Sequence, residues 1–317
     1  MIQRNSLEAA TVLKLMPARW HNSGAVPRPS LFERSAAWFG VASFATSFFL
    51  FAPAAICAEE KNSSPRTEDI LKKTIERAKW SEEHKFEAKY TYTQRGTFEE
   101  LDSSENVKKR EERVSQVFPI DGQPYARLIL KDGKPLSDKE ERVEQERERK
   151  FREGLAERRR KREQGKREDT ELELNEELVS KYQFDLTGRE RVNGRPAFVL
   201  SFQPKSADLP VKRKLDRLLN KVSGKVWIDE QDYEISRADL HLVENVSAWG
   251  GMLASVRKFL FHLEQAKVDE AVWLPSFVDG YIDGRILIRS LHMRLKQQNC
   301  DFRRIETQVG LANTSKR

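Results

Sequence analysis

Apolar and polar residues alternate with a period of two over much of the second half of the chain. The pattern is clearest over Gly224–Asp229, Tyr233–Val243, Val256–Ala266 and Glu270–Pro275. A period of two predicts β-strands that bury one face. By the same reasoning we expect further strands at Lys85–Tyr92, Asn106–Pro119, Tyr125–Lys131, Phe184–Glu190, Ala197–Pro204 and Val278–Met293.

Short turns separate these strands. Asn193-Gly194 is the strongest turn signal, and Asp121-Gly122 and Asp132-Gly133 are of the same kind. Such dipeptides favour tight hairpins between antiparallel strands. We therefore expect roughly nine or ten strands connected in order, and a sheet of that size must curl or be covered to bury its apolar face.

Two helices are expected outside the sheet. Glu68–Ala78 carries a single apolar stripe and follows Ser64-Pro65, which suits the start of a helix. Asp208–Asn220 is expected to be a short basic helix, with Leu215, Leu218 and Leu219 on one side. Both helices are amphipathic, which indicates that they pack on the sheet.

A charged insertion interrupts the strand pattern at Ser137–Asp169. It begins with the capping-box sequence Ser137-Asp138-Lys139-Glu140, and its apolar residues are Val143, Phe151, Leu155 and Ala156. We interpret it as a long solvated helix with one thin contact stripe. Arg158–Arg162 offers the alternative of contact with phosphate groups, although acidic residues surround that stretch.

These elements predict an α+β fold. Its main part is an antiparallel β-sheet curled into an incomplete barrel. An N-terminal helix, the long charged helical insertion and the short basic helix accompany the sheet. We expect one domain over residues 59–304, which includes the insertion at 137–169, followed by a polar tail at 305–317.

The pattern of the first 58 residues indicates a leader. Arg34 precedes an uncharged stretch, Ser35–Ala58, and a polar segment follows, which is typical of a secretory signal. We expect cleavage near Ala58 and a periplasmic protein. The alternatives are an uncleaved anchor, a lipoprotein acylated at Cys57, and a true start at Met16.

Composition excludes several classes of protein. The chain has 57 basic and 50 acidic residues, and the residues after 58 have 52 and 48, a net charge of +4. This small excess does not favour nucleic acid as a partner. Two cysteines in the whole chain exclude a disulfide framework.

No motif of catalysis or metal binding is found. The five histidines lack the spacings of metal sites, and there is neither a Gly-x-Ser-x-Gly sequence nor a phosphate-binding loop. We therefore expect a protein that is not an enzyme and that has no cofactor and no metal.

Large apolar side chains are abundant on one face of the predicted strands. They form either an ordinary core or the wall of a cavity for an apolar ligand. The apolar segment Ser247–Ala254 lies between two strands as either a plug on the core or a mobile lip. As cavity residues we predict Phe184, Phe198, Leu200, Phe202, Trp227, Ile235, Leu240, Trp249, Phe259, Phe261 and Trp273.

The second half of the chain resembles a known family. The resemblance rests on four segments, Gly188–Phe202, Gly224–Asp229, Tyr233–Leu240 and Ala271–Pro275. They are similar to the outer-membrane lipoprotein-sorting family with the LolA/LolB-like fold, which is related to periplasmic regulators of the MucB/RseB type. The resemblance implies an incomplete antiparallel barrel, closed by helices, with an apolar cavity for acyl chains.

The resemblance and the residues together predict a periplasmic carrier or sensor that binds an acyl chain or a lipoprotein. The alternative is a regulatory module that binds a partner protein or an anionic membrane surface through its basic helical elements. For that surface the candidates are Lys212, Arg213, Lys214 and Arg217. We expect a monomer.

Overall fold

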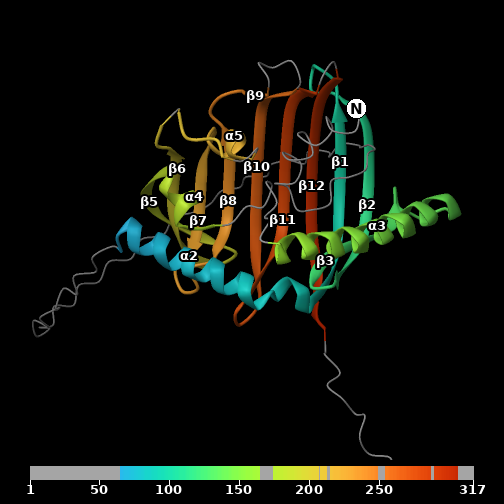
Figure 1. The fold of residues 1–317 in the computed structure, drawn as a ribbon, viewed down its shortest axis with the longest axis horizontal. Coiled ribbons are helices and arrows are strands. Elements are labelled where there is room, and N and C mark those ends of the chain that lie inside the picture. The colour runs from blue at the N-terminus through green and yellow to red at the C-terminus, as the bar shows by residue number, and fades with distance from the viewer. Residues whose placement is uncertain are drawn as a thin grey trace, which may run out of the picture.

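The computed structural model describes residues 65–164, 174–206, 208–212, 215–248, 254–286 and 289–305. In these residues the main element is one antiparallel sheet, which curves strongly and carries helices across one face (Figure 1). The expected α+β fold with an unclosed antiparallel sheet is confirmed. The predicted leader lies outside the described residues, as does all but the first residue of the predicted tail.

Twelve strands make up the sheet in the described chain. They are β1 (Tyr90–Leu101), β2 (Val107–Ile120), β3 (Gln123–Lys131), β4 (Lys134–Pro135), β5 (Tyr182–Val192), β6 (Arg195–Pro204), β7 (Val222–Asp229), β8 (Ile235–Leu242), β9 (Val246–Ala248), β10 (Ala254–Asp269), β11 (Val272–Ile286) and β12 (Arg289–Arg304).

The strand order shows how the two halves of the chain join. It runs β4-β3-β2-β1-β12-β11-β10-β8-β7-β6-β5, with β9 paired to β10. Most neighbouring strands are also consecutive in sequence. There are two exceptions: β8 pairs with β10, and the last strand, β12, lies beside β1. The outermost strands at the two ends, β4 and β5, do not pair with each other. The barrel is therefore open.

Three differences from the expected strands have local causes. Lys85 ends the first helix in the left-handed region, at φ 47°, and Phe86–Lys89 form a 3-10 turn (η2), so the strand begins at Tyr90 instead of Lys85. Pro275 does not divide its strand, because it lies at a bulge in the β10–β11 pairing. The short strands β4 and β9 are too brief to show a period.

The helices are α2 (Thr67–His84), α3 (Asp138–Glu163), α4 (Glu176–Ser180) and α5 (Asp216–Leu219). The first two confirm the expected helices. The basic helix expected at 208–220 was too long: among its described residues, only Asp216–Leu219 are helical. Pro210 cannot donate a backbone hydrogen bond, and the backbone N–H of Lys212 is bonded to the side chain of Asp216, which also forms a buried ion pair with Lys181.

Two glycines permit the close approach of neighbouring strands. A Cβ added at Gly224 in β7 would lie 2.0 Å from the backbone oxygen of Asp239 in β8, and one at Gly284 in β11 would lie 2.3 Å from the backbone oxygen of Ser255 in β10. No side chain fits at such distances. The backbones of these strand pairs can therefore approach so closely because these positions are glycine.

A buried carboxylate organises the turn between β7 and β8. Asp229 is 1% exposed. It accepts hydrogen bonds from Nε and Nη2 of Arg195 and from the backbone N–H groups of Gln231 and Asp232. Burial alone would raise the pKa of Asp229, but these hydrogen bonds outweigh it and lower the pKa.

Candidate functional site

The face of the sheet that carries α2 and α3, here called the inner face, contains one long row of paired residues. Cross-strand partners project to the same side of a sheet. The row therefore places on one face, from β2 to β5, Glu111, Phe98, Leu295, Gly280, Phe261, Leu240, Gly224, Phe202 and Phe184. The row is charged at one end and aromatic at the other.

Its central part belongs to an apolar cluster, which we call the apolar strip. Phe259 and Ile282 are buried at its centre, at 3% and 1% exposed, and Phe261 lies parallel to Phe259 with ring centroids 6.2 Å apart. All members of the strip come from β8 to β12, and none comes from a described helix. They are Leu240, Leu242, Val246, Val256, Phe259, Phe261, Ile282, Leu291 and Met293.

A second cluster lies under α2. Ile70 of α2 is completely buried against Phe198, Leu200 and Ile228. The predicted cavity residues Phe184 and Ile235 are at its margin, and the ring of Phe202 packs on Phe184 and Tyr182. These predicted residues are therefore brought together, but with a helix packed on them.

The two tryptophans among the predicted cavity residues lie elsewhere. Trp227 pairs with Val199 and Arg237, on the outer face of the sheet, and its indole N–H donates to Glu190 at 2.8 Å. Trp273 donates to Asp232 at 2.8 Å. Neither is part of the apolar strip. Trp249 lies outside the described residues, as does the centre of the predicted lip, residues 249–253.

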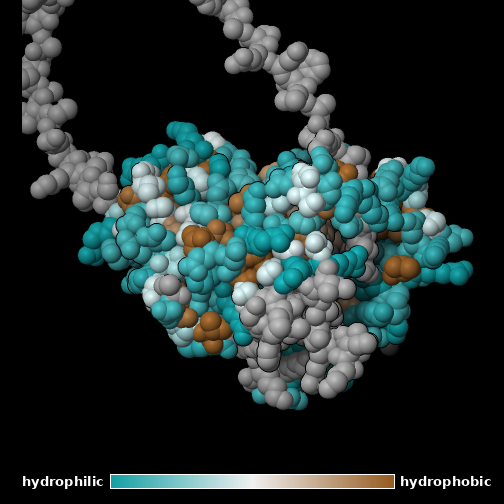
Figure 2. All heavy atoms as spheres, turned by 90° about the horizontal axis from the view of Figure 1, so that it is seen from above, coloured by the Kyte–Doolittle hydropathy of each residue, from teal (hydrophilic) through white to brown (hydrophobic). Residues whose placement is uncertain are grey.

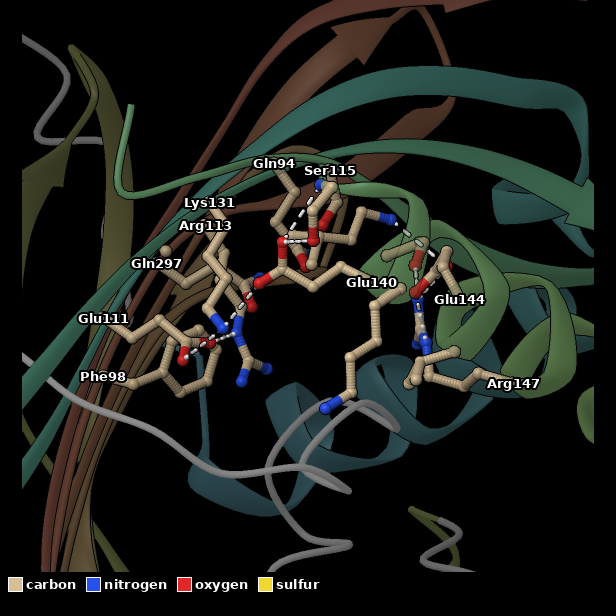
Figure 3. Close-up of a pocket in the computed structure, with 16 residues that line it drawn as sticks. Gln94, Phe98, Glu111, Arg113, Ser115, Lys131, Glu140, Glu144, Arg147 and Gln297 are labelled. Atoms are coloured by element: carbon tan, nitrogen blue, oxygen red, sulfur yellow. Dashed lines mark hydrogen bonds and ion pairs between the residues drawn. The ribbon is translucent and has the colours of Figure 1, made fainter. Parts of the chain in front are cut away.

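The charged end of the inner face forms a cavity of about 650 Å³ between the sheet and α3 (Figure 3). Phe98, Glu111 and Arg113 line one side, and Glu144 and Arg147 of α3 line the other, as Figure 3 shows. The guanidinium of Arg113 lies over the ring of Phe98 and pairs with Glu111. We call this space the charged cavity.

Buried amides form the floor of the charged cavity. Gln94 and Gln297 line it, and both donate from Nε2 to Oδ1 of Asn299, at 3.3 and 3.2 Å. Asn299 in turn donates to the backbone oxygen of Pro275 at 2.7 Å. The three amides are each less than 10% exposed. Ser115, also buried, completes this polar floor.

The helix α3 is attached to the sheet mainly through polar groups. Glu144, 4% exposed, accepts from the hydroxyl of Tyr125 at 2.8 Å and from the backbone N–H of Leu128 at 3.2 Å. Phe151 and Leu155 supply the apolar contact, beside Tyr125. The contact stripe expected in the insertion is thus observed at these two residues, whereas Val143 is 56% exposed.

Glu140 gives a prediction for the pH dependence of this attachment. The hydroxyl of Ser137, then Lys131, then the backbone N–H of Ser137 lower the pKa of Glu140 from 4.5 to about 2. The lowered pKa means that ionised Glu140 stabilises the folded state above about pH 4.5, and that this contribution is lost as the pH falls toward 2. A ¹³C NMR titration of the Glu140 carboxyl should have its midpoint near 2. A midpoint near 4.5 would show that the capping box is not formed.

The basic candidates are only partly described. Lys212 pairs with Glu177 at 2.7 Å, and Arg217 is exposed on α5. Arg213 and Lys214 lie outside the described residues. In α3, Arg158 lies over the ring of Phe151, and Arg159 and Arg160 are exposed.

The described residues contain neither a cluster of metal ligands nor a membrane-spanning helix. No group of histidine, cysteine and carboxylate side chains there is arranged to hold a metal ion. No described helix is long and apolar enough to cross a membrane. Seen from above, the surface is mostly hydrophilic, with hydrophobic residues in small groups (Figure 2).

The charged cavity was not foreseen from the sequence. Its residues come from four strands and a helix and have no common motif. One signal was present: Glu144, Arg147, Glu148, Phe151 and Leu155 recur at helical spacing and mark the face of the insertion that meets the sheet.

Comparison with known proteins supports the expected likeness. Residues 68–208 match the model of the MucB/RseB N-terminal domain, so this part of the chain is similar to proteins of the MucB/RseB type. No curated protein matches the chain.

Solved structures with which the chain aligns have low identity. One, described as an outer membrane lipoprotein-sorting protein domain from Vibrio parahaemolyticus, is 12% identical over 77% of this chain and 95% of that one, with a TM-score of 0.29. A LolA superfamily protein from Nitrosomonas europaea is 9% identical over 77% and 96%, with a TM-score of 0.26. A structure of the MucA/MucB complex of Pseudomonas aeruginosa is 11% identical over 73% of this chain and 100% of that one, with a TM-score of 0.21.

Proposed function

We propose that this protein, whose residues 68–208 match the MucB/RseB N-terminal domain, is a periplasmic binding protein that holds an acyl chain against the apolar strip. The observation that carries the proposal is the make-up of the strip. Helices contribute to the clusters on either side of it, through Ile70 of α2 and Leu155 of α3, whereas the described members of the strip are all strand residues.

The strip has the chemistry that an acyl chain requires. Burial of each CH₂ group contributes about 0.8 kcal/mol, so the affinity of an acyl chain rises with the number of its CH₂ groups that contact the strip. Phe261 and Met293 are partly buried members of the strip. Methionine adapts its shape to different partners. Such a wall suits a ligand of variable length better than one of fixed shape.

The mechanism is binding and release, without a chemical step. The charged cavity continues the same row of residues beyond the strip, from Phe261 through Leu295 to Phe98. An amphipathic ligand therefore fits with its chain on the strip and its polar head in the charged cavity. This arrangement applies equally to a free lipid and to the acylated end of a lipoprotein.

The second candidate is a regulatory module that binds a partner protein. It is favoured by the match to the MucB/RseB N-terminal domain, since a MucB structure with which the chain aligns is a complex with MucA. The exposed side chain of Arg217 and the charged surface of α3 are then the contact regions. A partner that is captured from envelope extracts by delipidated protein, and released by salt, supports this candidate.

The test of acyl-chain binding uses two neighbouring residues on opposite faces of β10. Phe261 belongs to the apolar strip, whereas Leu260 pairs with His241 and Tyr281 on the outer face and is 44% exposed. In a fluorescent fatty-acid titration, Phe261→Asp should weaken binding at least about 10-fold, because a charge then faces the chain. Leu260→Asp should leave binding unchanged.

Circular dichroism and urea unfolding establish that both variants are folded. Equal loss of binding in the two variants would contradict the proposal, as would a native protein that takes up no fatty acid after delipidation. In that event the strip is ordinary core and the regulatory module remains.

A further inference from the structure

The outer edge of β3 has backbone groups that point away from the sheet. In an antiparallel pair the N–H and C=O of one residue point to the same side, and successive residues alternate. Pro124, Ala126 and Leu128 direct these groups away from β2, toward the edge. An uncovered edge of this kind is a template for pairing with a strand of another chain.

Two side chains of α3 bond the backbone at this edge (Figure 3). Arg147 donates from Nη2 to the backbone oxygen of Ala126, and Glu144 accepts from the backbone N–H of Leu128 at 3.2 Å. The two side chains also bond each other, since Nε of Arg147 donates to Oε2 of Glu144 at 2.8 Å. An added strand would supply one donor and one acceptor to the same two backbone groups. The Glu144–Arg147 pair thus takes the place of a missing strand.

Other features close the remainder of the β3 edge. Leu130 and Lys131 pair with the short strand β4, and Pro124 has no N–H to donate. Glu144 is 4% exposed, so its bond to Leu128 is shielded from water. A short edge strand, a proline and a covering helix are all means by which proteins prevent pairing at a sheet edge.

The opposite face of α3 carries paired charges in water. Arg149 bonds Glu146 at 2.7 Å and Glu153 at 2.9 Å, and these three side chains are 41–61% exposed. A surface of mixed charges such as this does not favour association. The helix therefore replaces a strand edge by a solvated surface at the β3 end of the sheet (Figure 1).

We infer that β3 is a strand-docking edge which α3 keeps closed, and that the partner it excludes is a second copy of the chain. Among the described strands, β5 pairs only with β6 and ends the sheet on the other side. An opened β3 of one copy would accept β5 of the next, and a head-to-tail contact of this kind continues from copy to copy. This role of α3 is independent of acyl-chain binding at the apolar strip.

The experiment opens the edge in the full-length chain. The edge variant carries alanine at Glu144 and Arg147, and also at Phe151 and Leu155, which anchor the helix beside Tyr125. The native protein should remain a monomer in multi-angle light scattering as its concentration rises. The edge variant should form a series of oligomers, with an average mass at least about twofold higher.

The matched control places four alanines on the exposed face of the same helix, at Glu146, Arg149, Lys150 and Glu153. Both variants leave the net charge of the chain unchanged, because each removes equal numbers of acidic and basic residues. The control should remain a monomer. Oligomers in the control would overturn the inference, because they would show that the number of charges on α3, and not the closed edge, keeps the copies apart.

Leu128→Pro, added to the edge variant, separates strand pairing from association of exposed apolar side chains. The N–H of Leu128 is directed away from β2, so proline removes no bond between β2 and β3. It does remove the donor that an added strand would use. The protein should therefore return to a monomer. Oligomers that persist would overturn the inference, as would an edge variant that is folded by circular dichroism and monomeric.

Hydrogen exchange tests the closed edge in the native protein, without any substitution. The amide of Leu128 should exchange at least about 10-fold more slowly than an amide of an unstructured peptide, because Glu144 bonds it. Exchange at the rate of the peptide would mean that the edge is open, and this result, or a native protein that is itself an oligomer, would overturn the inference even if the edge variant does not fold.

Discussion

Asp229→Ala is expected to lower the free energy of unfolding by about 3–5 kcal/mol. The substitution leaves the guanidinium of Arg195, which is 28% exposed, without its bidentate partner. It also deprives the backbone N–H groups of Gln231 and Asp232 of their acceptor. Urea unfolding at pH 7 measures the loss.

Asp229→Asn distinguishes the two contributions. Its side-chain oxygen still accepts the two backbone hydrogen bonds of the turn, whereas the charge opposite Arg195 is lost. We expect a loss smaller than that of the alanine variant but still above about 1 kcal/mol. If asparagine is as destabilising as alanine, the ion pair dominates. If alanine costs less than about 1 kcal/mol, the turn does not depend on Asp229.

Gly224→Ala is expected to cost at least about 3 kcal/mol, the upper end of the cost of overpacking. The added Cβ would meet the backbone oxygen of Asp239 at 2.0 Å, and a backbone atom of a paired strand cannot move aside as the end of a side chain can. The β7–β8 pair must therefore separate or flatten. Thermal or urea unfolding measures the loss.

The same substitution at Gly154 serves as the control. Gly154 lies within α3, and a Cβ added there would have no atom within 4 Å. Alanine is the better helix former by about 0.5–1 kcal/mol, so Gly154→Ala should stabilise the protein. Opposite signs for the two variants are the expected result. Destabilisation by both would mean that loss of glycine itself, and not the close strand approach, is responsible.

Much of the sheet was predictable because its signals are local. Asn193-Gly194 forms the expected hairpin between β5 and β6, and Ser137 with Glu140 forms the expected capping box. Of the capping box, the bonds observed are those that the backbone N–H and the hydroxyl of Ser137 donate to the carboxylate of Glu140. In each case residues that are close in sequence determine the geometry. The alternation of side chains likewise placed Phe261 and Leu240 on one face.

What was not predictable depends on pairing between distant strands. One of the two neighbours of β1 is β12, and no feature of Tyr90–Leu101 identifies that partner. The charged cavity requires this pairing, because Gln94 and Gln297 meet only across it. Trp227 shows a second limit: its strand was identified, but its register places it on the outer face, where Arg237 lies over its ring at 4.2 Å.

The path of α2 has a mechanical consequence. Its first turns are anchored beside β6 through Ile70, its middle is tied by Arg77 to Glu234 and to the backbone oxygen of Ala271, and at its far end Trp80 packs on Phe86 in η2. Eighteen helical residues span about 27 Å. In a closed barrel the ring of hydrogen-bonded strands fixes the width. Here the sheet is open, so the contacts of α2 with separate parts of the sheet restrain its curvature. Loss of the Arg77 contacts should allow the sheet to open wider and to accommodate a bulkier ligand.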